Sequence, residues 1–165
     1  KFENKMPLVE KYLKLYDHVF VGGALANDVL KARGLEVGQS LVSDVSLVGA
    51  PFLWDEKLLI PIDVVVDGPR GVETKPADAV LPDEKIFDMG PETVAMLSRY
   101  IDASKTTLWN GPFGNYEAGF VDSTEAVARL IALGEGFSVL GGGDTVAAVE
   151  KLGLNDKFGF VSIFL

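Results

Sequence analysis

The 165-residue sequence contains no cysteine and a single histidine, His18. The absence of cysteine excludes disulfides, thiolate nucleophiles and cysteine-ligated metal sites. One histidine cannot build a multi-histidine metal centre, and a Ser-His-Asp triad would have to use His18, which begins an apolar run and for which we expect a structural role. No apolar run approaches membrane-spanning length and no signal peptide is visible, so we expect a cytoplasmic protein that does not contact membranes.

Basic residues are scarce relative to acidic ones. The 15 Lys and Arg residues oppose 24 Asp and Glu residues, which gives a formal net charge of −9. This balance disfavours adhesion to nucleic acid, and we expect no nucleic-acid partner. A small anionic ligand would need a local basic or metal-assisted site. With 48% hydrophobic residues the chain is globular, and its length is that of one ordinary domain.

Strand-like and helix-like segments alternate along the chain. We expect strands at residues 18–21, 58–66, 86–88, 106–109, 137–140 and 160–164, and helices at residues 7–16, 24–32, 91–101, 122–133 and 145–152. Pro61 should interrupt the second strand, and residues 67–82 should form a surface excursion. Leu8 belongs to the expected buried face of the first helix, and Asp122 or Ser123 should cap the fourth.

This alternation predicts an α/β fold. We expect a doubly wound, Rossmann-like, mainly parallel sheet of about six strands with helices on both faces. In such a fold the ligand lies at the carboxyl ends of the strands. Four glycine-bearing stretches should gather there: Gly22-Gly23, Gly90, Asn110–Gly114 and Gly141–Gly143.

The most informative stretch is FSVLGGGDTVAA, residues 137–148. An apolar strand ends in three glycines whose backbone N–H groups can approach a ligand closely. A helix beginning near Thr145 would direct its positive dipole end to the same place, which favours a phosphate. Asp144 would repel a bare phosphate, so we interpret it as a ligand of Mg²⁺ carried in with a nucleotide. Alternatively, Asp144 is only the helix N-cap.

Two further features are ambiguous when taken alone. The NGPFG segment, residues 110–114, is either a ligand wall or a connecting turn. Lys1 and Lys5 are either a phosphate-binding pair or solvated side chains. The GxxxxGKS/T and GxGxxG fingerprints are absent, but phosphoryl transfer needs little beyond backbone donors, a metal-binding carboxylate and lysines.

Several motifs follow one another along the chain. They are VGGALANDVLKARG (21–34), VGQSL (37–41), LIPIDVVV (59–66), FDMGPET (87–93), LWNGPFGNYE (108–117), LGGGDTVAAVEKLG (140–153) and FVS (160–162). Together with Lys1 and Lys5, they resemble the C-terminal, nucleotide-binding half of phosphoglycerate kinase over nearly the whole chain. WNGPFG and GGGDT, in this order and spacing, are highly specific for that family.

The resemblance implies a glycolytic activity. The acyl phosphate of 1,3-bisphosphoglycerate would pass to MgADP, and in reverse ATP would phosphorylate 3-phosphoglycerate. Residues 1–165 would be the nucleotide-binding domain of a kinase that is monomeric at full length. The N-terminal domain that holds phosphoglycerate, and the family's last glycine-rich loop, would be absent. We therefore expect this chain alone to bind nucleotide weakly and not to turn over.

The resemblance also implies roles for individual residues. Lys1 would contact the moving phosphate, Gly143 would share the catalytic role, and Lys5 would contact the nucleotide phosphates. Asp144 would hold Mg²⁺ with help from nearby backbone. The other nucleotide-binding residues would be Gly142, Gly143 and Thr145 at the phosphates, Gly22, Gly23, Ala24, Leu41 and Phe87 around the adenine, Asn110 and Pro112 along the groove, and Glu117 at the ribose hydroxyls.

The chain departs from the family pattern in three places. Ala24 replaces a frequent third glycine, Asn115-Tyr116 replaces an apolar–Phe pair, and Ile163 follows Ser162 where the family has threonine. Two other function classes stay open. A non-catalytic nucleotide-binding regulatory or assembly module would use the same pocket. A dinucleotide oxidoreductase would share the fold, but this sequence has no GxGxxG unit.

Overall fold

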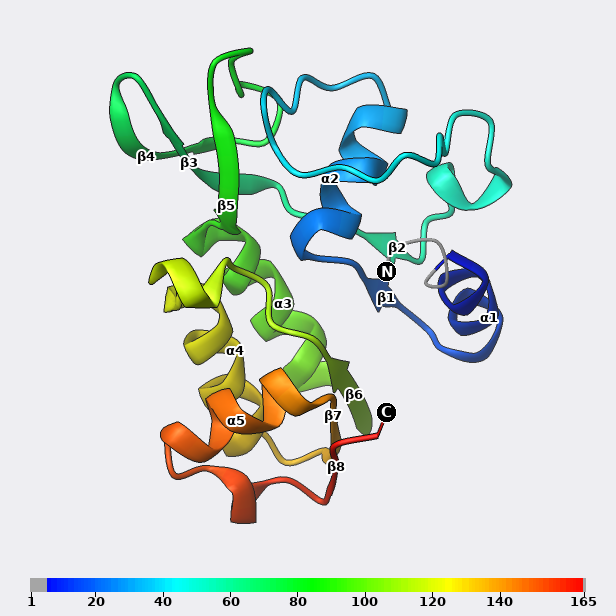
Figure 1. Cartoon of the computed structure of the whole chain (residues 1–165). Helices are drawn as coiled ribbons and strands as arrows, with labels where there is room; N and C mark the ends of the chain where they lie inside the picture. Colours follow the sequence, from blue (N-terminus) through cyan, green and yellow to red (C-terminus); the bar gives the residue numbers. More distant parts are fainter. Residues whose placement is uncertain (1–5, 165) are drawn as a thin grey trace. The chain divides into compact units, whose positions relative to one another are not determined.

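Figure 1 shows the computed structural model, which describes residues 6–164. The chain divides into two compact units, which are joined in sequence by the bond between Gly90 and Pro91. We call the part up to Gly90 unit 1 and the part from Pro91 unit 2, and describe each by itself. None of the described helices combines the length and the apolar character that crossing a lipid bilayer requires.

Unit 1 contains one parallel strand pair and one antiparallel sheet. Its elements are α1 (Met6–Leu15), β1 (Val19–Phe20), α2 (Gly23–Ala32), the 3-10 helix η2 (Pro51–Trp54), β2 (Leu58–Leu59), β3 (Asp63–Gly68), β4 (Gly71–Pro76) and β5 (Lys85–Met89). Strands β1 and β2 pair in parallel. Strand β3 lies between β4 and β5 and is antiparallel to both.

The strand prediction in unit 1 is correct around Pro61 and wrong beyond Asp67. The interruption at Pro61 is confirmed, because β2 ends at Leu59 and β3 begins at Asp63. The predicted surface excursion is exposed, but it contains a strand that was not predicted: the chain turns after Gly68 and returns along β3 as β4. Strand β4 is almost entirely exposed, so its sequence, GVETKP, lacks the alternating apolar side chains by which strands are recognised.

Helix α2 contributes to two apolar clusters in unit 1. Val29, 1% exposed, belongs to a cluster with Leu13 of α1 and Phe52 of η2. Leu30, also 1% exposed, belongs to another with Val64 of β3. Because consecutive helical residues point about 100° apart, a single helix can supply both cores. The antiparallel sheet and the parallel pair are therefore packed around the same helix.

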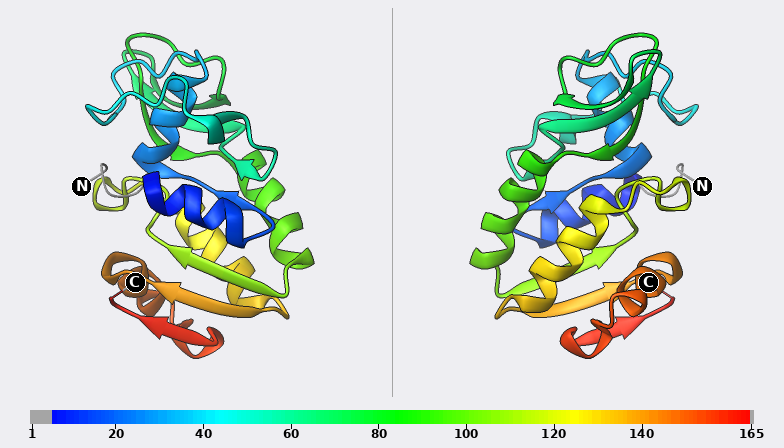
Figure 2. Two further views of the ribbon diagram at one scale, coloured as in Figure 1. Left: turned by 90° about the vertical axis from the view of Figure 1, so that its right-hand side faces the viewer. Right: turned by 90° about the vertical axis from the view of Figure 1, so that its left-hand side faces the viewer.

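Unit 2 is built on the parallel sheet β6-β7-β8. Its elements are α3 (Pro91–Ala103), β6 (Thr106–Asn110), the 3-10 helix η3 (Tyr116–Ala118), α4 (Asp122–Leu133), β7 (Phe137–Gly141), α5 (Gly143–Lys151), the 3-10 helix η4 (Asn155–Lys157) and β8 (Phe160–Ser162). Figure 2 shows the three strands side by side and pointing the same way. Helices α4 and α5, which connect these strands, lie on the side of the sheet where α3 also lies in Figure 1.

These strands confirm the α/β class, with parallel strands and helical crossovers. Two details of the helices differ from the sequence prediction. Leu8 is 40% exposed, whereas its neighbour Val9 is buried in the α1 face. The N-cap of α4 is Val121, which makes no side-chain capping bond, so neither Asp122 nor Ser123 is the cap. Asp122 and Ser123 instead occupy the first turn of α4.

A buried carboxylate holds the antiparallel sheet of unit 1 to the segment before β5. Glu84 is 1% exposed, and its carboxylate accepts hydrogen bonds from Lys75 Nζ at 2.9 Å, Arg70 Nη2 at 3.1 Å and the Leu81 N–H at 2.8 Å. The hydrogen bond from Lys75 is the main cause that lowers the pKa of Glu84 to about 2, with smaller help from Leu81 and Arg70. Arg70 also pairs with Asp83, which is half-exposed.

We predict that this network makes the chain sensitive to acid. A carboxylate with a lowered pKa stabilises the fold fully above its unfolded pKa, and the contribution is lost as the pH falls from about 5 towards about 2. Glu84→Gln should lower the free energy of unfolding at neutral pH and remove part of that acid dependence. Urea unfolding across this pH range measures both, with Asp78→Asn, at an exposed carboxylate outside this network, as the control. An unchanged pH dependence in Glu84→Gln would contradict the prediction.

Candidate functional site

The loop between β7 and α5 presents backbone N–H groups at the carboxyl edge of the sheet in unit 2. Helix α5 begins at Gly143, two residues earlier than predicted, with Gly142 as its N-cap. The first N–H groups of a helix have no partner inside it, so those of Gly143, Asp144 and Thr145 suit an anion. Asp144 lies inside the helix and is exposed, so the interpretation of Asp144 as the N-cap is wrong.

Gly142 shapes this turn. Its φ of +87° and ψ of 134° belong to a backbone region that glycine adopts readily and other residues do not. A Cβ there would lie 2.8 Å from Asn110 Oδ1. The Gly142 N–H donates to the Ser162 carbonyl of β8 at 3.1 Å, and its carbonyl accepts from the Val146 N–H at 3.0 Å. The Gly142 amide is therefore engaged within the protein, unlike those that follow it.

Thr145 joins the glycine loop to the NGPFG loop. Its side chain is almost fully buried, and its hydroxyl accepts a hydrogen bond from the Gly111 N–H at 2.7 Å. On the neighbouring strands, Asn110 pairs with Gly141 in the parallel register. The structure thus brings Asn110 beside the glycine loop, as their places after adjacent strands predict.

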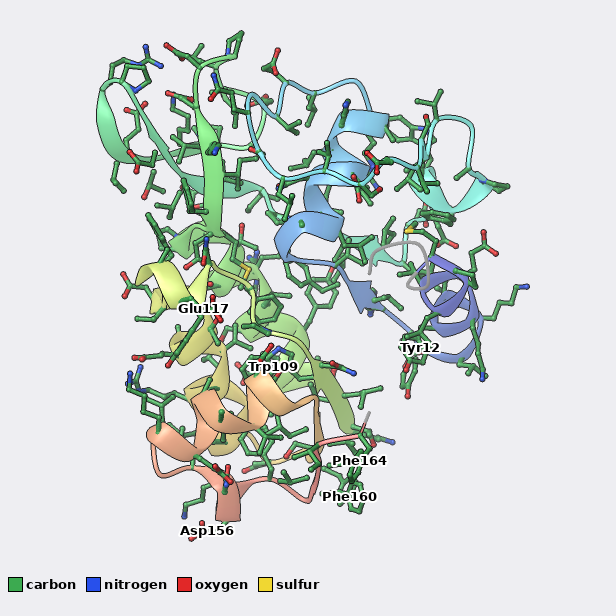
Figure 3. All side chains as sticks on the ribbon, viewed as in Figure 1. Tyr12, Trp109, Glu117, Asp156, Phe160 and Phe164 are labelled. Atoms are coloured by element: carbon green, nitrogen blue, oxygen red, sulfur yellow. The ribbon has the colours of Figure 1, made fainter. Side chains whose placement is uncertain are left out.

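The NGPFG loop is also fixed internally. The indole N–H of Trp109, a residue that Figure 3 labels at the end of β6, donates to the Gly111 carbonyl at 2.8 Å. Its ring stacks on Phe113 with the centroids 5.5 Å apart and the planes 7° from parallel. The Phe113 N–H donates to the buried hydroxyl of Thr124 on α4 at 3.0 Å. These contacts hold the loop on both sides of Pro112, and both the ligand wall and the connecting turn stay predictions.

Glu117 lies on the short helix η3, with its side chain exposed (Figure 3). Asn115 caps this turn by accepting from the Ala118 N–H at 3.2 Å. The Tyr116 ring lies 5.8 Å from Lys151 Nζ of α5, and burial together with Glu125 of α4 raises the pKa of its hydroxyl. The unusual Asn-Tyr pair therefore fastens the turn that carries Glu117.

The residues expected around the adenine all lie in unit 1. They are Gly22, the N-cap of α2; Gly23 and Ala24 in its first turn; Leu41 in an irregular segment; and Phe87 in β5. The segments of Leu41 and Phe87 lie side by side, because the Ile86 N–H donates to the Ser40 hydroxyl at 2.8 Å. The Leu41 side chain is 65% exposed. The predicted ribose residue, and the predicted phosphate and metal residues other than Lys1 and Lys5, lie in unit 2.

Lys1 and Lys5 lie outside the described residues, so their roles stay predictions. Among residues 6–164, no three His, Asp or Glu side chains gather into a metal site. A lone exposed carboxylate such as Asp144 fits a Mg²⁺ ion that keeps phosphate and water ligands, rather than one enclosed by protein.

Sequence reasoning missed the residues that support this site from behind. The Thr124 hydroxyl and the Ser162 carbonyl were not singled out, and Thr145 was expected to act through its backbone rather than its hydroxyl. Thr124 and Thr145 are both less than 2% exposed in the first turns of their helices. One sequence signal could have indicated both threonines: a hydroxyl residue in the first turn of a helix, on the helix face that is buried.

Comparison with known proteins identifies the family. The family profile described as phosphoglycerate kinase matches residues 1–163. The chain belongs to the phosphoglycerate kinase family. A phosphoglycerate kinase from Rubrobacter xylanophilus is 42% identical over 171 residues, which cover 98% of this chain and 43% of that protein.

Solved phosphoglycerate kinases have the same fold over this length. The structure from Coxiella burnetii superposes with a TM-score of 0.89 at 36% identity, over 98% of this chain and 45% of that one. The structure from Pyrococcus horikoshii gives a TM-score of 0.81 at 26% identity, over 99% and 44%. The chain thus spans less than half the length of the phosphoglycerate kinases that it matches.

Two neighbouring glycines of the loop should respond differently to substitution. Gly142→Ala should destabilise the chain by about 1–3 kcal/mol, because alanine disfavours a φ of +87° and its Cβ would press on Asn110. Gly143→Ala should change stability by less than about 0.5 kcal/mol, because its added Cβ would meet no atom within 4 Å beyond its chain neighbours and the backbone of its own helix. Urea unfolding compares the two, and equal destabilisation would contradict the conformational role of Gly142.

Proposed function

We propose that this chain is the ADP- and ATP-binding part of a phosphoglycerate kinase. Membership of that family and the GGGDT loop at the start of α5 carry the proposal. The reaction is the Mg²⁺-dependent transfer of the acyl phosphate of 1,3-bisphosphoglycerate to ADP, and its reverse from ATP to 3-phosphoglycerate. This is a phosphotransferase reaction with a carboxyl group as acceptor, and it places the protein in glycolysis.

The phosphate end of the nucleotide binds at α5. The N–H groups of Gly143 and Thr145 donate to phosphate oxygens, and the helix dipole adds to the attraction. Gly142 completes this site by fixing the path of the backbone. Asp144 holds Mg²⁺, which neutralises charge on the phosphates when it is bound. Gly143 and Lys1 act on the phosphoryl group in transfer, and Lys5 contacts the nucleotide phosphates.

The rest of the nucleotide extends from this end. Glu117 accepts hydrogen bonds from the ribose hydroxyls, and its exposed carboxylate on a fastened turn suits that task. Asn110 and Pro112 line the groove from a loop that the buried Thr124 and Thr145 hydroxyls hold. The apolar and backbone surfaces that enclose the adenine are Gly22, Gly23, Ala24, Leu41 and Phe87.

The acceptor substrate is bound elsewhere in the full-length enzyme. Phosphoglycerate carries several negative charges, and the net charge of −9 on this chain is unsuited to hold it alone. We assign its binding to an N-terminal domain, and residues 1–165 to the nucleotide-binding domain. The full-length enzyme is a cytoplasmic monomer without nucleic-acid or membrane partners.

Binding of MgADP should depend on Asp144. Asp144→Ala should weaken MgADP about tenfold or more, which corresponds to at least about 1.4 kcal/mol, while ADP without Mg²⁺ should bind both forms similarly. Isothermal titration calorimetry measures these affinities. The control is Glu150→Ala, an exposed acidic residue near the other end of α5. Equal MgADP affinities for wild type and Asp144→Ala would count against the metal role.

The chain alone should bind nucleotide without turning over. Because the acceptor is bound by another domain, the two reacting groups are not brought together here, and proximity supplies much of phosphoryl-transfer catalysis. A coupled assay with 3-phosphoglycerate, ATP and Mg²⁺ on the purified chain should show no turnover above background. Measurable conversion would refute the assignment of the acceptor site to other residues.

A further inference from the structure

The segment that carries Leu41 is irregular, yet it is held by hydrogen bonds at every second residue from Gln39 to Ser43. The Gln39 N–H donates to the Glu84 carbonyl at 2.8 Å. The Ser43 N–H donates to Asp28 Oδ1 at 2.8 Å. Between them, the Leu41 carbonyl accepts from Asn27 Nδ2 of α2 at 3.0 Å. Leu41 is therefore an exposed apolar side chain on a firmly held backbone.

Asn27 makes this bond from a buried position. The residue is 4% exposed, and its Oδ1 atom is buried with no hydrogen-bond partner among the described residues. The orientation of the amide follows from chemistry, because the Leu41 carbonyl can only accept and so faces the nitrogen. A buried acceptor without a partner destabilises a fold. An apolar residue of similar size would avoid the unpaired Oδ1 but would also take the donor away from the Leu41 carbonyl, so the bond to Leu41 is what the Asn27 amide supplies.

We propose that Asn27 is a positioning residue, which holds the Leu41 backbone so that the Leu41 side chain packs on the adenine of the bound nucleotide. This inference rests on the proposed function, since it takes Leu41 as part of the adenine site. Asn27 lies one helical turn after Gly23. Helix α2 therefore contributes to the predicted adenine site in two ways: through its first turn and, by way of Asn27, through the position of Leu41. Asn27 therefore affects the binding of the base and not the binding of the phosphates.

The test compares a ligand with a base and a ligand without one. Asn27→Leu removes the donor and the unpaired acceptor together at similar size. It should weaken MgADP about three- to tenfold, the loss expected for one hydrogen bond, and leave magnesium pyrophosphate binding unchanged. Its melting temperature should change little, because the loss of the bond to Leu41 and the removal of the unpaired acceptor have opposite effects. Calorimetry and thermal unfolding of the 165-residue chain measure these quantities.

Asn155→Leu is the matched control. Asn155 in η4 also has a buried Oδ1 without a partner among the described residues, but it belongs to unit 2, whereas the predicted adenine residues belong to unit 1. This variant should bind MgADP like the wild type. A double-mutant cycle adds the specific test: in a Leu41→Ala background, Asn27→Leu should cause little further loss, because the side chain that it positions is already gone.

Each outcome decides between the two proposals. If wild type fails to bind MgADP, the proposed function fails and this inference falls with it. If wild type binds but Asn27→Leu binds MgADP equally well, only the positioning role is overturned. It is also overturned if Asn27→Leu loses MgADP and magnesium pyrophosphate to the same extent and melts earlier, which is the result of a purely structural role. Full additivity with Leu41→Ala overturns it as well.

Discussion

The hydrogen bond from the Gly111 N–H to the Thr145 hydroxyl is the contact on which the joining of the two predicted ligand-binding loops of unit 2 depends. At 2.7 Å and largely shielded from water, it joins the loop after β6 to the first turn of α5. Adjacent parallel strands already bring Asn110 and Gly141 into register. The threonine then fixes the two loops that follow, so the predicted phosphate site and the predicted groove wall are held as one structure.

The backbone donors of the glycine loop divide between structure and ligand. Gly142 gives its N–H to β8 and bends the chain, which leaves the next amides pointing out of the helix start. Glycine at position 142 is therefore needed mainly for the conformation of the backbone. The exposed Asp144 carboxylate stands in the same turn, and this combination of amide donors and a single acid suits a ligand that brings its own cation.

Much of the fold can be predicted from the sequence, because most strands and helices follow local patterns of residue types. Apolar runs ending in glycine indicate parallel strands followed by helices, and the interruption at Pro61 follows from its missing N–H. The pattern fails for β4, because an exposed edge strand has no buried face and is stabilised by its pairing with β3. It also fails at the start of α4, where Val121 rather than a polar residue is the N-cap.

The sequence by itself determined the α/β class and the phosphoglycerate kinase family, because both depend on residue types and spacings along the chain. Only the tertiary structure decided that the Thr145 hydroxyl holds Gly111, that the Gly142 amide is engaged by β8, and that buried Asn27 holds Leu41. These are hydrogen bonds between residues far apart in sequence. Which polar group meets which is set by how the elements pack, since buried polar groups must find partners in the folded chain.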